Sequence, residues 1–124
     1  MTDYAKIQVS IVYSPNSDYS SPIYHRLFES TYTPSEVQIQ RVSVATGGTT
    51  VELGSFTTPT TVIVKNTDAT NYVTAAFTNA ASSSQSQVIA LGETAVFPDV
   101  KASGDLVLTA NTAAVVCDVV ILGD

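Results

Sequence analysis

The side chains best suited to catalysis or metal binding occur singly in this chain. His25 is its one histidine and Cys117 its one cysteine. A serine nucleophile would need a base such as His25, but the sequence lacks the Gly-X-Ser-X-Gly turn that exposes such a serine. Cys117 lies among valines, where a thiol is expected to be a small buried hydrophobe, because a reactive thiol needs an electropositive, partly exposed site. One histidine and one cysteine cannot supply a zinc site. We therefore expect no enzyme activity and no cofactor.

Acidic side chains offer two further candidates. Asn66, Thr67 and Asp68 present consecutive polar oxygens, but the glycine and the distal glutamate of a calcium loop are missing, so the segment is interpreted as a structural turn. Asp118 interrupts the most apolar stretch of the chain. It is expected either to pair as a buried acid with Arg26 or Arg41, or to mark the edge of an apolar face.

Tyrosine and arginine dominate the remaining candidates. Phosphate-binding glycine loops are absent from the sequence. Five of the six tyrosines fall within the first 32 residues, where they could stack on sugars. Tyrosine and arginine are also the residues that anchor protein interfaces, because each combines a large contact area with a polar tip. We therefore predict a protein interface in an attachment region over residues 1–50, formed by Tyr13, Tyr19, Tyr24, Arg26, Tyr32 and Arg41.

The charge of the chain excludes several kinds of partner. Five basic against eleven acidic residues give a formal charge of −6. Nucleic-acid binding needs a basic patch, and an anionic membrane surface repels an acidic chain. No apolar run approaches the ~20 residues of a membrane span, and the polar N-terminal segment lacks the apolar core of a signal peptide. We expect neither nucleic acid nor membrane as a partner, and the single cysteine fits synthesis in a reducing cytoplasm.

The elements that must position these residues are predicted to be strands. Thr and Val each occur 17 times and Ser 14 times, while charged residues make up only 13%. That composition suits half-buried pleated surfaces and not helix exteriors. Apolar alternation predicts strands over 7–13, 37–44 and 51–53, and favours a strand over a helical turn at 23–30. The apolar phase changes within 37–44, which predicts a β-bulge near Arg41.

The second half of the chain repeats the pattern with clearer turns. Strands over 60–65 and 72–78 are expected to form a hairpin around the turn at 66–71. Residues 80–87 are expected to be a polar loop or the tip of a hairpin, followed by short strands at 88–91 and 95–97. Strands at 106–110 and 115–122 form the last predicted pair, joined around Asn111-Thr112, and the final strand is expected to be central. The predicted core comprises Val62, Val64, Leu106, Leu108, Val115, Val119 and Ile121.

Together these segments predict an all-β fold. Eight to ten short strands separated by polar turns are typical of a single antiparallel β-sandwich, here jelly-roll-like. We expect one domain over 1–124, with residues 51–124 supplying most of the core.

Three segments of that second half carry a resemblance to known proteins. They read Val62-Ile63-Val64-Lys65-Asn66-Thr67-Asp68-Ala69-Thr70-Asn71-Tyr72-Val73, Leu91-Gly92-Glu93-Thr94-Ala95-Val96-Phe97 and Ala110-Asn111-Thr112-Ala113-Ala114-Val115. The pattern resembles the small β-sandwich virion structural proteins of tailed bacteriophages, of the capsid decoration (cement) type. It spans residues 51–124, and residues 1–50 have no counterpart in it.

The resemblance implies a function without a catalytic site. A decoration protein is made in the host cytoplasm, lies on the outer capsid surface of the virion and stabilises contacts between subunits of the major capsid protein. A homo-oligomer, dimer or trimer, is expected with it. Two alternatives stay open: a tail, neck or baseplate accessory protein, and a carbohydrate-binding adhesion module with exposed aromatic residues clustered on one concave face.

Overall fold

The computed structural model describes residues 5–13, 24–32, 34, 36–53, 56, 60–101 and 106–123, with the backbone alone at 5, 12, 13, 24, 25, 32 and 60. Strands account for about 70% of the described residues and no helix occurs in these ranges, so the all-β prediction is confirmed. The chain divides into two compact units, Met1–Pro34 and Ser35–Asp124. That the two units form one domain over 1–124 stays a prediction.

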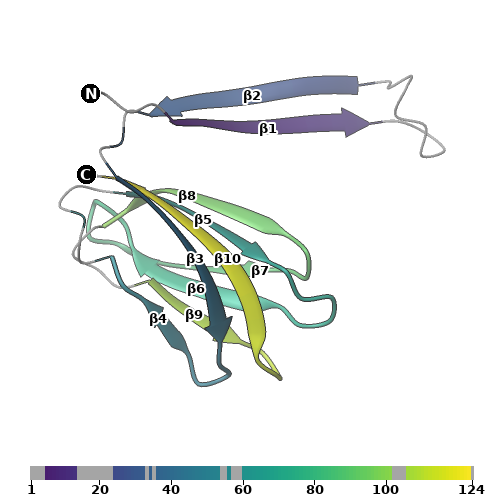
Figure 1. Ribbon diagram of the computed structural model, residues 1–124, viewed down its shortest axis with the longest axis vertical. Coiled ribbons are helices and arrows are strands. Elements are labelled where there is room, and N and C mark those ends of the chain that lie inside the picture. The colour runs from purple at the N-terminus through teal and green to yellow at the C-terminus, as the bar shows by residue number, and fades with distance from the viewer. Residues whose placement is uncertain are drawn as a thin grey trace. The chain divides into compact units, whose positions relative to one another are not determined.

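The first unit contains a two-stranded antiparallel hairpin (Figure 1). Strands β1 (Ala5–Tyr13) and β2 (Tyr24–Tyr32) pair without interruption from Ala5 opposite Tyr32 to Tyr13 opposite Tyr24. The predicted strands at 7–13 and 23–30 are therefore confirmed. In the second strand, the strand assignment prevails over the helical alternative.

The second unit is a sandwich of two four-stranded antiparallel sheets (Figure 1). One sheet has the order β3-β10-β5-β8 and the other β4-β9-β6-β7. The strands are β3 (Glu36–Val44), β4 (Thr49–Val51), β5 (Thr60–Asn66), β6 (Val73–Thr78), β7 (Ser84–Ile89), β8 (Thr94–Val100), β9 (Leu106–Ala110) and β10 (Val115–Gly123). Both β3 and β4 thus belong to the sandwich, although β3 and the first two residues of β4 fall within the predicted attachment region 1–50.

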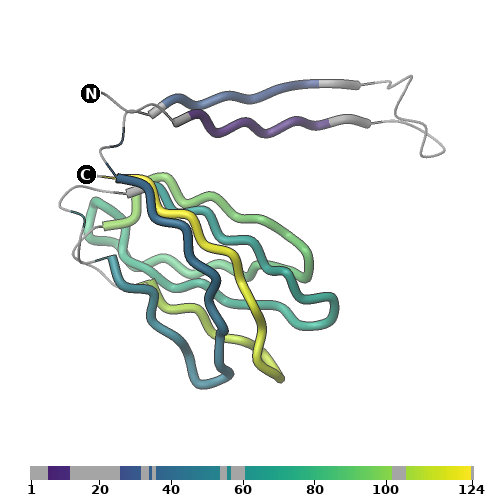
Figure 2. The backbone as a smooth tube through the Cα atoms, in the orientation of Figure 1, coloured from purple at the N-terminus to yellow at the C-terminus, as the bar shows by residue number. Residues whose placement is uncertain are grey.

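The order of the eight strands is that of a jelly roll. The first strand pairs with the last, and the pairs continue inward as β4–β9, β5–β8 and β6–β7. Figure 2 traces β3 and β10 side by side along their length. A ribbon of four such pairs, folded so that alternate pairs enter opposite sheets, gives the two Greek keys of this architecture. The jelly-roll-like sandwich is therefore confirmed.

The core lies between the two sheets. All seven residues predicted for it are at most 1% exposed. β10 is an inner strand of its sheet, as expected, and its inward residues alternate with outward ones over most of its length. The rings of Phe77 and Phe97, from opposite sheets, lie 4.8 Å apart between centroids in a tilted arrangement. Apolar burial on this scale stabilises the sandwich by the hydrophobic effect.

Both predicted hairpins of the second half are wrong. β5 and β6 lie in opposite sheets, and so do β9 and β10. The segments between them cross the edge of the sandwich instead of returning within one sheet. Apolar alternation and turn residues reveal where a strand ends, but they do not distinguish a return within one sheet from a crossing to the other.

Two local predictions also differ from the structure, one wholly and one in part. The register of β3 against β10 runs without a shift from Glu36 to Val44, so there is no bulge near Arg41. The change of apolar phase has another cause: Val37 and Ile39 are exposed on the outer face, whereas Val44 is buried on the inner face. The prediction for the polar segment 80–87 is correct in part: residues 80–83 lie at the tip of the hairpin that β6 forms with β7, but β7 begins at Ser84. β7 is a largely exposed edge strand, so its sequence is as polar as a loop.

Candidate interaction surface

The predicted interface residues divide between the two units. Arg26 lies in β2 of the hairpin, and Arg41 lies in β3 of the sandwich. Tyr19 lies outside the described residues, as do the side chains of Tyr13, Tyr24 and Tyr32. The backbones of Tyr13 and Tyr24 pair with each other, and that of Tyr32 pairs with Ala5. The six residues are therefore not one cluster on a single sheet.

The hairpin has one predominantly apolar face. Because residues that pair across an antiparallel ladder share a face, the register places six described side chains together: Ile7, Val9, Ile11, Arg26, Phe28 and Ser30. We call this set the apolar face. Val9, Ile11 and Phe28 are each exposed over almost half of their surface. Exposed apolar clusters of this kind mark sites of protein interaction.

Arg26 is the one charged residue of the apolar face. Its guanidinium carbon lies 4.8 Å from the centroid of the Phe28 ring. That distance is within the range of a cation–π contact, which holds a planar guanidinium flat against an aromatic surface. Both residues come from β2, two positions apart and therefore on the same face, so the strand geometry places the guanidinium beside the ring.

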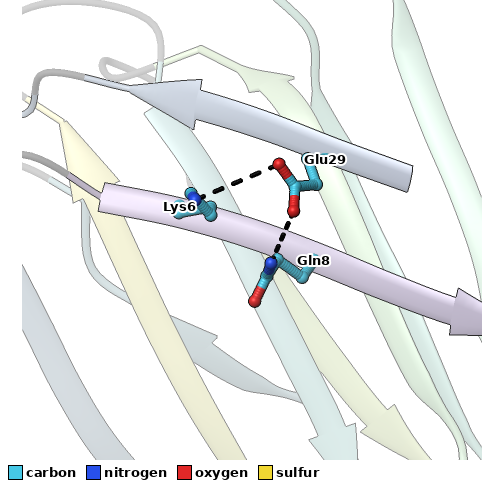
Figure 3. Close-up of polar contacts among 3 residues, drawn as sticks. All are labelled: Lys6, Gln8 and Glu29. Atoms are coloured by element: carbon cyan, nitrogen blue, oxygen red, sulfur yellow. Dashed lines mark hydrogen bonds and ion pairs between the residues drawn. The ribbon is translucent and has the colours of Figure 1, made fainter. Parts of the chain in front are cut away.

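Among its described side chains, the opposite face of the hairpin is polar apart from Leu27. Figure 3 shows Glu29 of β2 between two residues of β1. Its carboxylate accepts a hydrogen bond of 2.7 Å from the Gln8 side-chain amide and lies 4.0 Å from the Lys6 ammonium group. All three side chains are exposed, so these contacts fix the register more than they stabilise the fold.

The outer face of the β3–β10 pair in the sandwich holds a second exposed apolar strip. Ile39 is 78% exposed and Val37 about half exposed. Beside them Arg41 Nε lies 3.3 Å from Asp118 Oδ1. Of the two readings of Asp118, pairing with Arg41 is thus confirmed, but the pair is solvent-exposed and not buried.

The turn after β5 is organised by two polar side chains. Asn66 is fully buried, and its amide nitrogen donates to the carbonyl oxygens of Asn71, Ile89 and Ala90 at 2.9–3.3 Å. Asp68 Oδ1 accepts hydrogen bonds of 2.7 Å from the backbone N–H groups of Thr70 and Asn71. These bonds favour the ionised carboxylate and lower the pKa of Asp68. The interpretation of 66–68 as a structural turn is therefore confirmed.

Cys117 is fully buried on the inner face of β10, as its surroundings in the sequence predicted. Burial, with the negative charges of Asp118 and Asp68 adding to it, raises the pKa of the thiol to about 11. A thiol of that pKa is almost entirely protonated near neutral pH, so it has little nucleophilic character. The side chain of His25 lies outside the described residues.

Sequence reasoning missed the exposure of apolar strand residues. Residues 7–13 alternate as a half-buried strand would, yet Val9 and Ile11 are exposed. The signal that could have found this is the partner strand: β2 places Arg26 and Ser30 on the same face, and a buried face of a sheet seldom includes an unpaired arginine.

No protein family model matches the chain, and neither the curated proteins nor the solved structures give a match. Within the described ranges, no three His, Cys, Asp or Glu residues gather in a group that could hold a metal ion. The same ranges contain no helix that is long and apolar enough to cross a membrane.

Proposed function

We propose that the chain is a structural protein of a tailed-phage virion that decorates the outer surface of the capsid. It binds the major capsid protein in many copies and stabilises the contacts between capsid subunits. The observation that carries the proposal is the apolar face of the hairpin, which the chain displays in addition to a sandwich that buries its own core. An exposed apolar surface of this kind is typical of a protein that functions by binding other proteins.

Two further considerations support the proposal. The residues that resemble decoration proteins lie in β5, β6, β8 and the segments that join β9 to β10, and all belong to the jelly roll. Jelly rolls are frequent in viral capsid proteins, but they also occur in lectins, so the fold by itself does not assign a function. The exposed aromatic side chains of the described residues are Phe28 and Tyr72, which come from different units and therefore give no support to a sugar-binding platform.

Counting copies in purified particles by mass spectrometry tests the location. We expect many copies per particle, in proportion to the major capsid protein. A few copies per particle would instead assign the chain to the tail, neck or baseplate and overturn the decoration proposal.

Co-sedimentation with empty capsids tests the surface. Phe28→Ala should weaken binding about tenfold, the effect of losing an aromatic interface anchor. Tyr72→Ala is the matched control, because Tyr72 is an aromatic residue of nearly equal exposure, 43% against 45%, on the sandwich. Equal binding by both variants and the wild type would refute the assignment of attachment to the hairpin.

A further inference from the structure

Within the described part of its own unit, the hairpin has no second sheet of the kind that covers the sandwich strands. It is a two-stranded sheet, and an isolated two-stranded hairpin is at best marginally stable in water. Each sheet of the sandwich covers one face of the other, whereas Val9, Ile11 and Phe28 of the hairpin are almost half exposed. Burial of the apolar face against another surface would stabilise the two strands.

We propose that the apolar face packs against the apolar face of a second copy of the chain, in a two-fold symmetric interface. This inference rests on the proposed function. It identifies a second copy of the chain as the partner of the apolar face. The polar face, with Lys6, Gln8 and Glu29, then stays available for the capsid, and the loss of Phe28 weakens capsid binding by weakening the dimer that binds there.

The hairpin unit is the part of the chain through which two copies would repel each other least. Residues 1–34 hold three acidic and two basic residues, a formal charge of −1, whereas residues 35–124 hold eight and three, a charge of −5. Two copies therefore meet with the least repulsion through their hairpins. The six residues of the apolar face include no carboxylate, so the one charge that burial covers is Arg26, whose guanidinium keeps its contact with the Phe28 ring.

The order of residues on the apolar face allows two copies of that face to pack on each other around a two-fold axis. The described part of the face is centred on the pair Val9–Phe28. A two-fold axis that crosses the strands at this pair stacks β1 on β1, so that Val9 meets Val9 of the second copy. Arg26 then lies opposite Ser30 of the second copy, and the two Arg26 residues are offset by about 13 Å along the strands, four residues at the strand rise.

The size of the face implies a weak dimer. Two strands of nine residues span roughly 30 Å by 10 Å, or about 300 Å² per copy before side chains are counted. This is below the ~800 Å² per partner of a standard stable interface. The dimer should therefore dissociate in dilute solution and form where copies are concentrated, as they would be on a capsid lattice.

Thiol crosslinking of the purified chain, without capsids, tests the interface. Val9→Cys should be trapped as a covalent dimer by a short bis-maleimide, because the two positions face each other at the axis across the ~10 Å that separates packed sheets. Ser10→Cys is the matched control, since it lies next in the strand and on the opposite face. The native Cys117 is buried and should not contribute. Equal trapping at both positions, or trapping at neither, would overturn the proposal.

Sedimentation equilibrium gives an independent measurement. The wild type should dimerise more strongly as salt screens the repulsion between two acidic chains. Val9→Lys should weaken the dimer about tenfold or more, whereas Ser10→Lys should leave it nearly unchanged. A wild type that stays monomeric at high concentration and high salt would contradict the inference. If that monomer still binds empty capsids, the proposed function stands and the apolar face belongs to the capsid contact.

Discussion

The hairpin and the sandwich contain strands of the same alternating pattern, but the apolar side is exposed in the hairpin and buried in the sandwich. Val9 in β1 and Val119 in β10 both occupy nine-residue strands with alternating apolar positions, yet Val9 is 48% exposed and Val119 is fully buried. The difference lies in what covers each strand. β10 has strands on both sides and a second sheet across its inner face, whereas β1 pairs only with β2 in the described structure. Alternation thus identifies a strand with two unlike faces, and the topology decides whether the apolar face is buried.

The polar contacts of the two regions differ in the same way. In the hairpin Glu29 joins Lys6 and Gln8 on an exposed face, where water competes for every bond. In the sandwich Asn66 is fully buried, and its side chain joins the end of β5 to the segment after β7. A buried hydrogen-bonding group has no water to replace a lost partner, so contacts of this second kind are the costly ones to remove.

The largest expected effect is a loss of stability when an aspartate replaces a valine of the sandwich core, compared with the same change in the hairpin. Val119→Asp places an unpaired charge between the sheets, at a cost of several kcal/mol. A domain of this size has a total stability of about 5–15 kcal/mol, so the sandwich should fail to fold or should melt far below the wild type. Circular dichroism and thermal unfolding measure this directly.

The same change in the hairpin is the control. Val9→Asp lies on an exposed face and should change the stability of the sandwich by no more than about 0.5 kcal/mol. Val116→Asp, at an outward position of β10 itself, should also leave the sandwich folded. A native melting temperature for Val119→Asp would show that β10 is not the central buried strand.

Much of the fold could be predicted from the sequence because its strands are short and strongly patterned. The strands at 7–13, 60–65 and 106–110, the turn at 66–71 and all seven predicted core residues agree with the structure. What failed depended on long-range pairing. No local signal revealed that β3 pairs with β10, since the two strands lie at opposite ends of the sandwich unit in sequence.

The candidate surface was predicted less well, for a related reason. Tyrosine and arginine content drew attention to the N-terminal part of the chain, but composition could not divide it at residue 34, where the hairpin unit ends. Arg26 and Arg41 were therefore predicted for one interface, although they belong to separate units. The apolar members of the hairpin face were assigned to a half-buried strand because alternation alone does not reveal what covers it.

The second expected effect measures the buried polar contact. Asn66→Ala removes a side chain that donates to three carbonyl groups and accepts from the backbone N–H of Asp68. Leaving buried groups unsatisfied should lower the free energy of unfolding by about 2–3 kcal/mol in urea titrations. Asn111→Ala is the control, because Asn111 is exposed, and it should cost no more than about 0.5 kcal/mol. Equal losses in the two variants would mean that Asn66 contributes no more than an exposed asparagine.

The smallest expected effect concerns the charge that completes the same turn. The pKa of Asp68 is lowered in the folded state, chiefly by the backbone N–H groups of Thr70 and Asn71, from an ordinary value of 3.8. A lowered folded pKa means that the ionised carboxylate stabilises the fold above the unfolded pKa and that this contribution disappears as the pH falls through the folded value. Asp68→Asn keeps an oxygen acceptor at the position but cannot ionise. The wild type should therefore have the higher urea midpoint at neutral pH, and its advantage over Asp68→Asn should shrink steadily once the pH falls below 3.8. An advantage that stays constant, or grows, in acid would show that the turn depends on the shape of the side chain and not on its charge.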